Sequence, residues 1–147
     1  MNGGKKNESR DLSNRTKAFA LQIIRLYSSL PRRAEAQVIG RQVLRSGTSV
    51  GAQYREARRA RSTAEFVSKL GGSVQELEET IYWLELLVES ELVSGNYIAD
   101  IRREAEELMA ILVSSVKTVK QRSSPNITSY FIVHSSAFGA TPPSGGP

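Results

Sequence analysis

Two stretches decide the fold of this chain: residues 36–57, AQVIGRQVLRSGTSVGAQYREA, and residues 66–88, FVSKLGGSVQELEETIYWLELLV. In each stretch, apolar or small residues recur every three or four positions, a spacing that places them on one face of an α-helix. No proline occurs from Arg32 to Ser124, so no proline breaks a helix in this span. Both stretches are therefore predicted to be helices of about seven turns, at about 3.6 residues per turn.

The same spacing predicts two further helices, one on each side of this pair. The first apolar series extends from Leu12 to Leu30, and the last extends from Ile98 to Val119. Short connections make consecutive helices antiparallel neighbours, and we expect them at residues 30–33, 60–63 and 93–96. The sequence therefore predicts an all-α protein, an antiparallel up-down-up-down four-helix bundle with shallow left-handed crossings.

Local signals add detail to this bundle. Ser62, with Glu65 three residues later, has the pattern of a capping box, in which side chains bind the free N–H groups of a helix start. Within residues 36–57, a cluster of small side chains lowers helix propensity but lets a neighbouring backbone come close. We expect tight packing or a slight bend at this cluster, which consists of Ser46, Gly47, Ser49 and Gly51.

The two ends of the chain differ in composition from the middle. Residues 1–10 are polar, and we expect them to be flexible. Residues 123–147 contain no Lys, Arg, Asp or Glu and are rich in Ser, Pro and Gly, which is typical of a disordered segment. Within this tail, residues 130–133, YFIV, are a short apolar run with β propensity. The expected folded part, the four-helix bundle, is residues 11–122.

The overall composition limits the classes of function. A chain of 147 residues without cysteine has no disulfide framework, no thiolate zinc site and no cysteine nucleophile. The absence of cysteine favours a reducing compartment, and no apolar stretch has the length of a signal peptide or a membrane span. We therefore expect a cytoplasmic protein with no membrane partner. The net charge of +5 is compatible with an anionic partner such as nucleic acid.

Catalytic and metal sites find little support in the sequence. The one histidine lies in the expected tail, so no Ser-His-Asp set can form on the bundle. The glutamates Glu56, Glu76 and Glu79 raise the possibility of a di-metal carboxylate site, but such sites also need histidines on the helices. We therefore expect no enzymatic activity, no cofactor and no metal. We assign these three glutamates, together with Arg45 and Lys69, to a structural polar network.

Charge is divided between the two central stretches. Residues 32–61 carry eight arginines against two glutamates, a net charge of +6, whereas residues 62–91 carry seven glutamates against one lysine, a net charge of −6. One interpretation is that neighbouring helices, within a subunit or between subunits, are electrostatically complementary. The other is that arginines and lysines at two helix ends form one surface that binds phosphates. These residues are Arg55, Arg58, Arg59 and Arg61, with Lys117, Lys120 and Arg122.

Large apolar side chains near the end of residues 66–88 lie on more than one face of the expected helix. Such a helix is typical either of a wide core or of a subunit interface. Ordinary core packing of Trp83 is the simpler alternative. We predict an oligomer interface that includes Tyr82, Trp83, Leu86 and Leu87.

Three segments, taken together, resemble a known family. They are residues 45–57, RSGTSVGAQYREA, residues 64–70, AEFVSKL, and residues 76–87, ELEETIYWLELL. Over about residues 12–121, the chain resembles the bacterial 23S rRNA intervening-sequence proteins. In many bacteria these proteins are encoded by insertions within large-subunit ribosomal RNA genes. Each segment alone is a weak signal, but their combination is specific.

The resemblance implies an all-helical bundle that assembles as a ring-shaped homopentamer without established enzymatic activity. Accessory proteins of diversity-generating retroelements share this fold and pentameric form, and they bind nucleic acid and a reverse transcriptase. Gln53 departs from the more usual Asn of the family, and Gly71 and Gly72 replace bulkier residues. The positions that match the family pattern are Arg45, Ser49, Gly51, Tyr54, Glu56, Phe66, Lys69, Glu76, Glu79, Tyr82 and Trp83.

Two hypotheses for the function follow. In the first, the protein is a non-enzymatic homo-oligomer, a pentamer, that binds RNA or DNA through its arginine-rich surface. In the second, it is a structural or protein-binding scaffold whose arginines pair with the acidic helix of the next subunit, and it does not bind nucleic acid.

Overall fold

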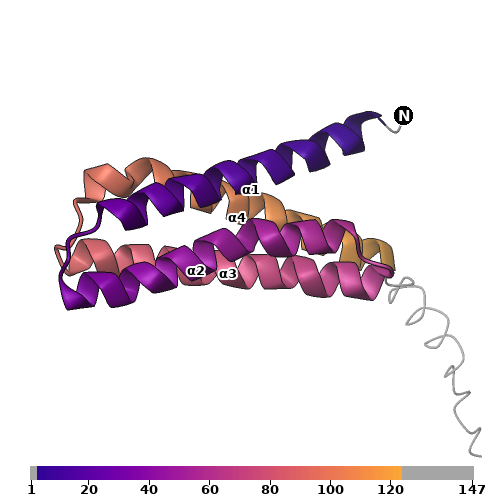
Figure 1. The fold of residues 1–147 in the computed structure, drawn as a ribbon. Helices are drawn as coiled ribbons and strands as arrows, with labels where there is room; N and C mark the ends of the chain where they lie inside the picture. Colours follow the sequence, from indigo (N-terminus) through magenta and orange to yellow (C-terminus); the bar gives the residue numbers. More distant parts are fainter. Residues whose placement is uncertain (1–2, 124–147) are drawn as a thin grey trace, which may run out of the picture.

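The structure is a computed structural model that describes residues 3–123, except for the side chains of residues 5–7 and 9 (Figure 1). The described part consists of four helices joined by short connections, and each helix is antiparallel to the one before it. The predicted all-α, up-down-up-down four-helix fold is therefore confirmed. The helices are α1 (Gly3–Ser29), α2 (Ala34–Arg58), α3 (Thr63–Glu89) and α4 (Gly95–Ser123).

The core consists of the apolar series that the sequence places on one face of each helix. Every helix contributes fully buried side chains, and burial of one Leu, Ile or Phe stabilises the fold by about 1.5–3 kcal/mol. The largest of these side chains are Phe19, Ile23, Leu26, Val43, Val50, Leu70, Leu77, Leu84, Leu87, Ile98, Leu108 and Leu112. The helical periodicity of the sequence thus predicts which face of each helix is buried.

Small residues in α2 allow α1 to pack closely against it. A Cβ atom added at Gly47 would lie 2.8 Å from Cγ1 of Ile23, and one added at Gly51 would lie 3.1 Å from Oγ1 of Thr16. Both distances are shorter than normal carbon contacts, so a larger residue would push α1 away from α2. The expectation of tight packing at this cluster is confirmed.

Buried hydroxyl groups connect α2 to α3. The Oγ atom of Ser73 donates a hydrogen bond of 2.8 Å to the carbonyl oxygen of Val50, and Oγ1 of Thr80 lies 2.8 Å from Oγ of Ser46. Ser46, Ser73 and Thr80 are all fully buried, so these hydrogen bonds satisfy polar groups that water does not reach. These hydroxyls fix the register of the two helices.

Two of the positions at which the sequence departs from the family pattern are in contact. The side-chain amide of Gln53 on α2 lies against the backbone of Gly72 on α3, where a Cβ atom would overlap Oε1 of Gln53. The longer side chain of Gln53 is thus accommodated by the missing side chain at Gly72, whereas a Cβ at Gly71 would meet no neighbouring atom. This pairing explains one glycine and leaves Gly71 without a structural reason.

The start of α3 is capped as the sequence predicts, with one difference. The backbone N–H of Glu65 donates to Oγ of Ser62 at 3.1 Å. The carboxylate of Glu65 accepts from the backbone N–H of Arg61 at 3.0 Å, one residue before the position that a capping box uses. The two side chains still satisfy backbone donors at the helix start.

The connection between α3 and α4 lies earlier than expected. Helix α3 ends at Glu89, and Glu91 has a φ of 61°, in the left-handed region that ends many helices. The backbone N–H groups of Leu92 and Val93 both donate to the carbonyl oxygen of Leu87. Leu92 is buried although it lies outside a helix, so the apolar series continues past the true helix end and hides it.

Helix α1 begins earlier than the apolar series indicates. It includes residues 3–10, for which the sequence predicts a flexible segment, and this end of α1 diverges from the other helices (Figure 1). Residues 3–10 contain no large apolar residue, so no apolar periodicity marks this part of the helix in the sequence. Of the predicted tail, residues 123–147, only Ser123 lies within the described residues, as the last residue of α4.

Candidate nucleic-acid interface

Four arginines lie at the C-terminal end of α2 and in the connection that follows it. Arg55 and Arg58 are in the last turn of α2, Arg59 is its C-cap residue, and Arg61 precedes the start of α3. All four side chains are exposed. Cations are stabilised at a helix C-terminus by the helix dipole, so these arginines need no carboxylate partner to be favourable there.

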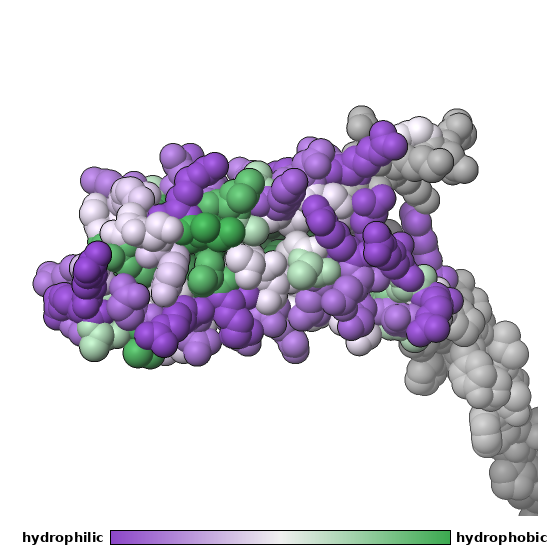
Figure 2. All heavy atoms as spheres, in the orientation of Figure 1, coloured by the Kyte–Doolittle hydropathy of each residue, from purple (hydrophilic) through white to green (hydrophobic). Residues whose placement is uncertain are grey.

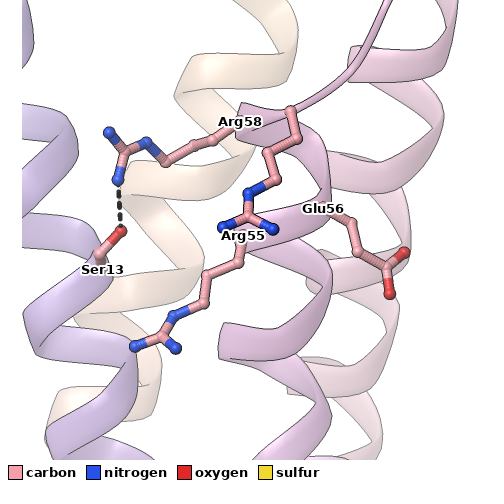
Figure 3. A pocket seen from close by; sticks show the side chains of 5 residues that line it. Ser13, Arg55, Glu56 and Arg58 are labelled. Atoms are coloured by element: carbon pink, nitrogen blue, oxygen red, sulfur yellow. Dashed lines mark hydrogen bonds between the residues drawn. The ribbon is translucent and has the colours of Figure 1, made fainter.

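Three of these arginines surround one open pocket (Figure 3). The pocket has a volume of about 570 Å³ and is lined by Arg55, Glu56, Arg58 and Arg59 of α2 and by Ser13 of α1. The Nη1 atom of Arg58 donates a hydrogen bond of 3.0 Å to Oγ of Ser13. In Figure 3, Arg55 and Arg58 both extend toward α1. The pocket thus concentrates three guanidinium groups between two helices.

The one carboxylate in the pocket lining is already paired. An ion pair of 2.7 Å joins Oε2 of Glu56 to Nζ of Lys69 on α3. The hydrogen bond and the charge of Glu56 raise the pKa of Lys69. In Figure 3 the carboxylate of Glu56 points away from Ser13 and Arg58. The positive charge of the pocket is therefore not cancelled by its own lining.

The basic residues differ in their partners. Arg61 lies 3.9 Å from a carboxylate oxygen of Glu65, but its side chain is 92% exposed and this pair is weak. Within residues 3–123, Arg55 and Arg59 have no hydrogen-bond or ion-pair partner. The same is true, in the described part of the chain, of the three basic residues at the end of α4, Lys117, Lys120 and Arg122.

The two basic clusters occupy the same end of the bundle. The C-terminal ends of α2 and α4 lie at that end, as the antiparallel topology requires (Figure 1). Lys117, Lys120 and Arg122 do not line the pocket of Arg55, Arg58 and Arg59. The α4 cluster therefore adds positive charge to the same end of the molecule but not to the pocket itself.

The residues assigned to a polar network lie between α2 and α3. Nη1 of Arg45 is 3.1 Å from Oε2 of Glu76, and its other terminal nitrogen contacts Glu79. The hydrogen bond with Glu79, together with the charge of Glu76, raises the pKa of Arg45. The structure thus brings Arg45, Glu76 and Glu79 together, and it joins Glu56 to Lys69 in a separate pair.

A second polar link, between α1 and α4, is not apparent from the sequence. Arg15 of α1 binds Glu104 and Glu107 of α4, each at 2.9 Å. The hydrogen bond with Glu104 is the largest of the causes that raise the pKa of Arg15. These residues are far apart in the sequence, and no periodicity relates them. Ser13 in the arginine pocket cannot be found from the sequence for the same reason.

The predicted oligomer interface is only partly a surface. Tyr82 is 52% exposed and packs on the ring of Trp83 with a centroid distance of 5.0 Å, whereas Trp83 and Leu86 are half-buried. Leu87, at 0% exposure, lies in the core and does not contribute to an outer face. Nε1 of Trp83 is buried and finds no hydrogen-bond partner among the described residues.

A second apolar surface lies elsewhere on the bundle. Figure 2 shows apolar side chains gathered on the face formed by α1 and α2. The exposed large apolar residues of these two helices are Leu21, Ile24 and Val38. The sequence pattern does not reveal this face, because Leu21 and Ile24 lie beside the buried series of α1 rather than within it.

The described part of the chain contains neither a cluster of metal-binding side chains nor a helix that could span a membrane. Between residues 3 and 123, no three side chains of His, Cys, Asp or Glu are grouped so that they would hold a metal ion. None of the four described helices combines the length and the apolar character that a membrane crossing requires.

Comparisons with known proteins agree with this architecture. The chain is similar to a crystal structure of a protein of unknown function from the S23 ribosomal protein family of Bacteroides thetaiotaomicron. The two are 37% identical with a TM-score of 0.70, over 74% of this chain and 97% of that one. No curated protein matches the chain significantly. Residues 8–114 match the model of the 23S rRNA-intervening sequence protein family, and the chain therefore belongs to this family.

Proposed function

We propose that this protein is a non-enzymatic, cytoplasmic homo-oligomer, a pentamer, that binds RNA through the arginine pocket at the C-terminal end of α2. The observation that carries this proposal is that Arg55 and Arg59 line a concave site and have no acidic partner in the described part of the chain. Arginine binds phosphate through paired N–H groups, and binding releases the counterions that phosphates otherwise hold.

The contrast with α3 supports binding over internal pairing. In α3, residues 66–75 contain no Asp or Glu. Glu65 is therefore the one carboxylate that the first turns of α3 offer near the C-terminal end of α2. Glu65 is engaged with the backbone of Arg61. The arginines at this end are thus placed where an external anion has little competition.

The family supports RNA as the first nucleic acid to test. The family model that the chain matches is named for an intervening sequence of 23S rRNA, and the similar solved protein carries the name of a ribosomal protein family. Neither name describes a binding site. The pentamer rests on the resemblance to intervening-sequence proteins and on the exposed apolar side chains of Tyr82, Leu21, Ile24 and Val38.

Fluorescence anisotropy with a labelled single-stranded RNA, measured from about 50 to 200 mM salt, tests the proposal. The logarithm of affinity should fall linearly with the logarithm of salt concentration. Arg58→Ala with Arg59→Ala should weaken binding at least tenfold. The same double substitution should reduce the salt slope by about 1.4, because each phosphate that a protein neutralises on a single strand contributes about 0.7 to the slope.

The matched control is Arg41→Ala, because Arg41 is also exposed on α2 and has no ion-pair partner among the described residues. It removes the same type of charge from the same helix but lies outside the pocket. Arg41→Ala should weaken binding much less than a pocket substitution. Equal effects at both positions would mean that net charge, rather than the pocket, governs binding.

The scaffold function is the second candidate, and exposed carboxylates on α3 favour it. Glu78 and Glu89 are exposed and have no ion-pair partner within the described residues, so they are available to arginines of another subunit. Light scattering separates the two proposals. If Arg58→Ala with Arg59→Ala breaks the oligomer into 16.2 kDa subunits, and the unmodified protein ignores RNA at moderate salt, the scaffold function is correct.

A further inference from the structure

We infer that the arginine pocket takes a terminal phosphate of an RNA strand, a phosphomonoester, rather than the phosphodiesters along the strand. This inference rests on the proposed RNA binding and narrows it to one chemical group. It follows from the shape of the pocket, from its charge and from the position of Ser13.

The shape favours one phosphate over a row of phosphates. The three guanidinium groups of α2 line a single concavity of about 570 Å³, which Ser13 of α1 borders on the other side. This volume is within the range of small-molecule sites, about 300–1,000 Å³, and suits a phosphate with part of its nucleotide. A strand that passes along the bundle would contact such a concave site at one point only, whereas a strand end enters it.

The charge of the pocket matches a dianion. A phosphomonoester carries a charge of about −1.5 to −2 at pH 7 and has three free oxygens, whereas a phosphodiester carries a single negative charge and has two free oxygens. Each guanidinium can bind two oxygens of one phosphate side by side. With Arg55 and Arg59 both unpaired in the described part of the chain, the pocket offers more donors than one diester can use.

Ser13 completes the site from the neighbouring helix. Its Oγ atom accepts a hydrogen bond from Arg58, which holds that guanidinium toward α1. A serine hydroxyl has one donor and two acceptor positions, so the proton of Ser13 is left for an oxygen of the bound phosphate. Ser13 is therefore a positioning residue for Arg58 and also a donor to the ligand.

Glu56 sets the limit of the site. Its carboxylate would repel a phosphate, but the ion pair with Lys69 and its direction away from Arg58 weaken this repulsion. The pocket thus has a positive side, made by its three arginines and Ser13, and a neutralised side at Glu56. A phosphate is expected on the side that faces α1.

The experiment compares three forms of one single-stranded RNA of about ten nucleotides: with a 5′-phosphate, with a 3′-phosphate, and with hydroxyl groups at both ends. The full chain should bind at least one phosphorylated form about tenfold more tightly than the hydroxyl form, roughly the gain from one additional charge-assisted hydrogen bond. The two phosphorylated forms distinguish which strand end is recognised.

Variants connect the preference to the pocket. Arg59→Ala and Ser13→Ala should each reduce the preference for the phosphorylated RNA to about threefold or less, whereas Arg41→Ala should keep it. Circular dichroism of each variant checks that the helices are intact. Alanine replaces exposed or half-buried side chains at these positions, so the variants are expected to fold.

The outcomes separate this inference from the proposed function. Equal affinity for all three RNAs would overturn the terminal-phosphate inference while leaving RNA binding in place. A preference that persists in Arg59→Ala and Ser13→Ala would also overturn it, because another site would then recognise the end. An unmodified protein that binds none of the RNAs at about 50 mM salt, the low end of the range where salt dependence is read, would overturn both.

Discussion

The middle and the end of α2 carry the same residue type in opposite situations. In the middle, Arg45 contacts Glu76 and Glu79 of α3. At the end, Arg55 and Arg59 line a pocket and have no acidic partner within residues 3–123. The difference arises from α3, whose carboxylates resume at Glu76 after ten residues without any. A run of arginines in a sequence therefore does not have one function, because each arginine takes its role from the helix opposite.

The largest expected loss of RNA affinity comes from a substitution that places an additional carboxylate beside the C-terminal end of α2, as Glu76 and Glu79 lie beside its middle. Lys69→Glu places a carboxylate where Lys69 now neutralises Glu56, beside the pocket. Two carboxylates then compete with the phosphate, and RNA affinity should fall by more than about tenfold, or about 1.4 kcal/mol. Fluorescence anisotropy measures this loss.

Lys69→Gln is the control for that change, since it removes the cation without adding an anion. Its effect on RNA affinity should lie between those of the unmodified protein and Lys69→Glu. If Lys69→Glu binds RNA normally, the arginine pocket is not the RNA site.

The next effect concerns the paired middle of α2. Arg45→Ala should lower the free energy of unfolding by about 0.5–1 kcal/mol, because a half-exposed arginine loses two carboxylate partners. RNA affinity should change by less than about twofold, since Arg45 lies outside the pocket. Urea denaturation and anisotropy on the same variant give both numbers. A large loss of RNA binding with unchanged stability would reverse the roles assigned to the two regions.

A smaller effect separates charge from geometry at the end of α2. Arg59→Lys keeps the positive charge but loses the planar pair of donors that matches a phosphate. RNA affinity should fall about threefold, less than for Arg59→Ala, while the salt slope stays the same. An Arg59→Lys protein that binds as well as the unmodified one would show that only charge matters at this position.

The smallest effect is a pH dependence of stability near the boundary of the two regions. Glu56 raises the pKa of Lys69, so the stability that the pair contributes is fully present below the unfolded-state pKa of 10.5. It is lost as pH rises through the higher folded-state pKa, because Lys69 then loses its charge. The melting temperatures of the unmodified protein and Lys69→Gln should differ at about pH 8, and this difference should shrink as the pH rises past 10.5. A constant difference would mean that the pair contributes nothing.

Sequence patterns predict the fold in most of its parts. The core is defined by the apolar series from Leu12 to Leu30 and by the corresponding series of the other three helices, because a helix in a small bundle must bury one face. The end of α3 and the start of α1 are placed wrongly for opposite reasons. Buried Leu92 continues the apolar pattern beyond the helix, whereas the polar start of α1 has no apolar pattern at all.

The sequence predicts the candidate site less completely. It identifies Arg55, Arg58 and Arg59 as a cluster because they lie within one turn and a half of the same helix. It cannot identify Ser13, which reaches the pocket from α1 and hydrogen-bonds to Arg58 across 45 residues of sequence. Leu87 is predicted to lie in an interface but is buried in the core. The sequence does not separate the two, because an apolar side chain suits either place.

The sequence by itself determined the all-α bundle, its helix order, its family and the division of charge between α2 and α3, because these depend on local spacing and composition. The tertiary structure alone decided which charges are used within the subunit. Antiparallel packing brings Glu76 and Glu79 to Arg45 and leaves Arg55 and Arg59 facing a pocket beside Ser13. The physical reason is that electrostatic interactions depend on distances between atoms, which a linear sequence does not contain.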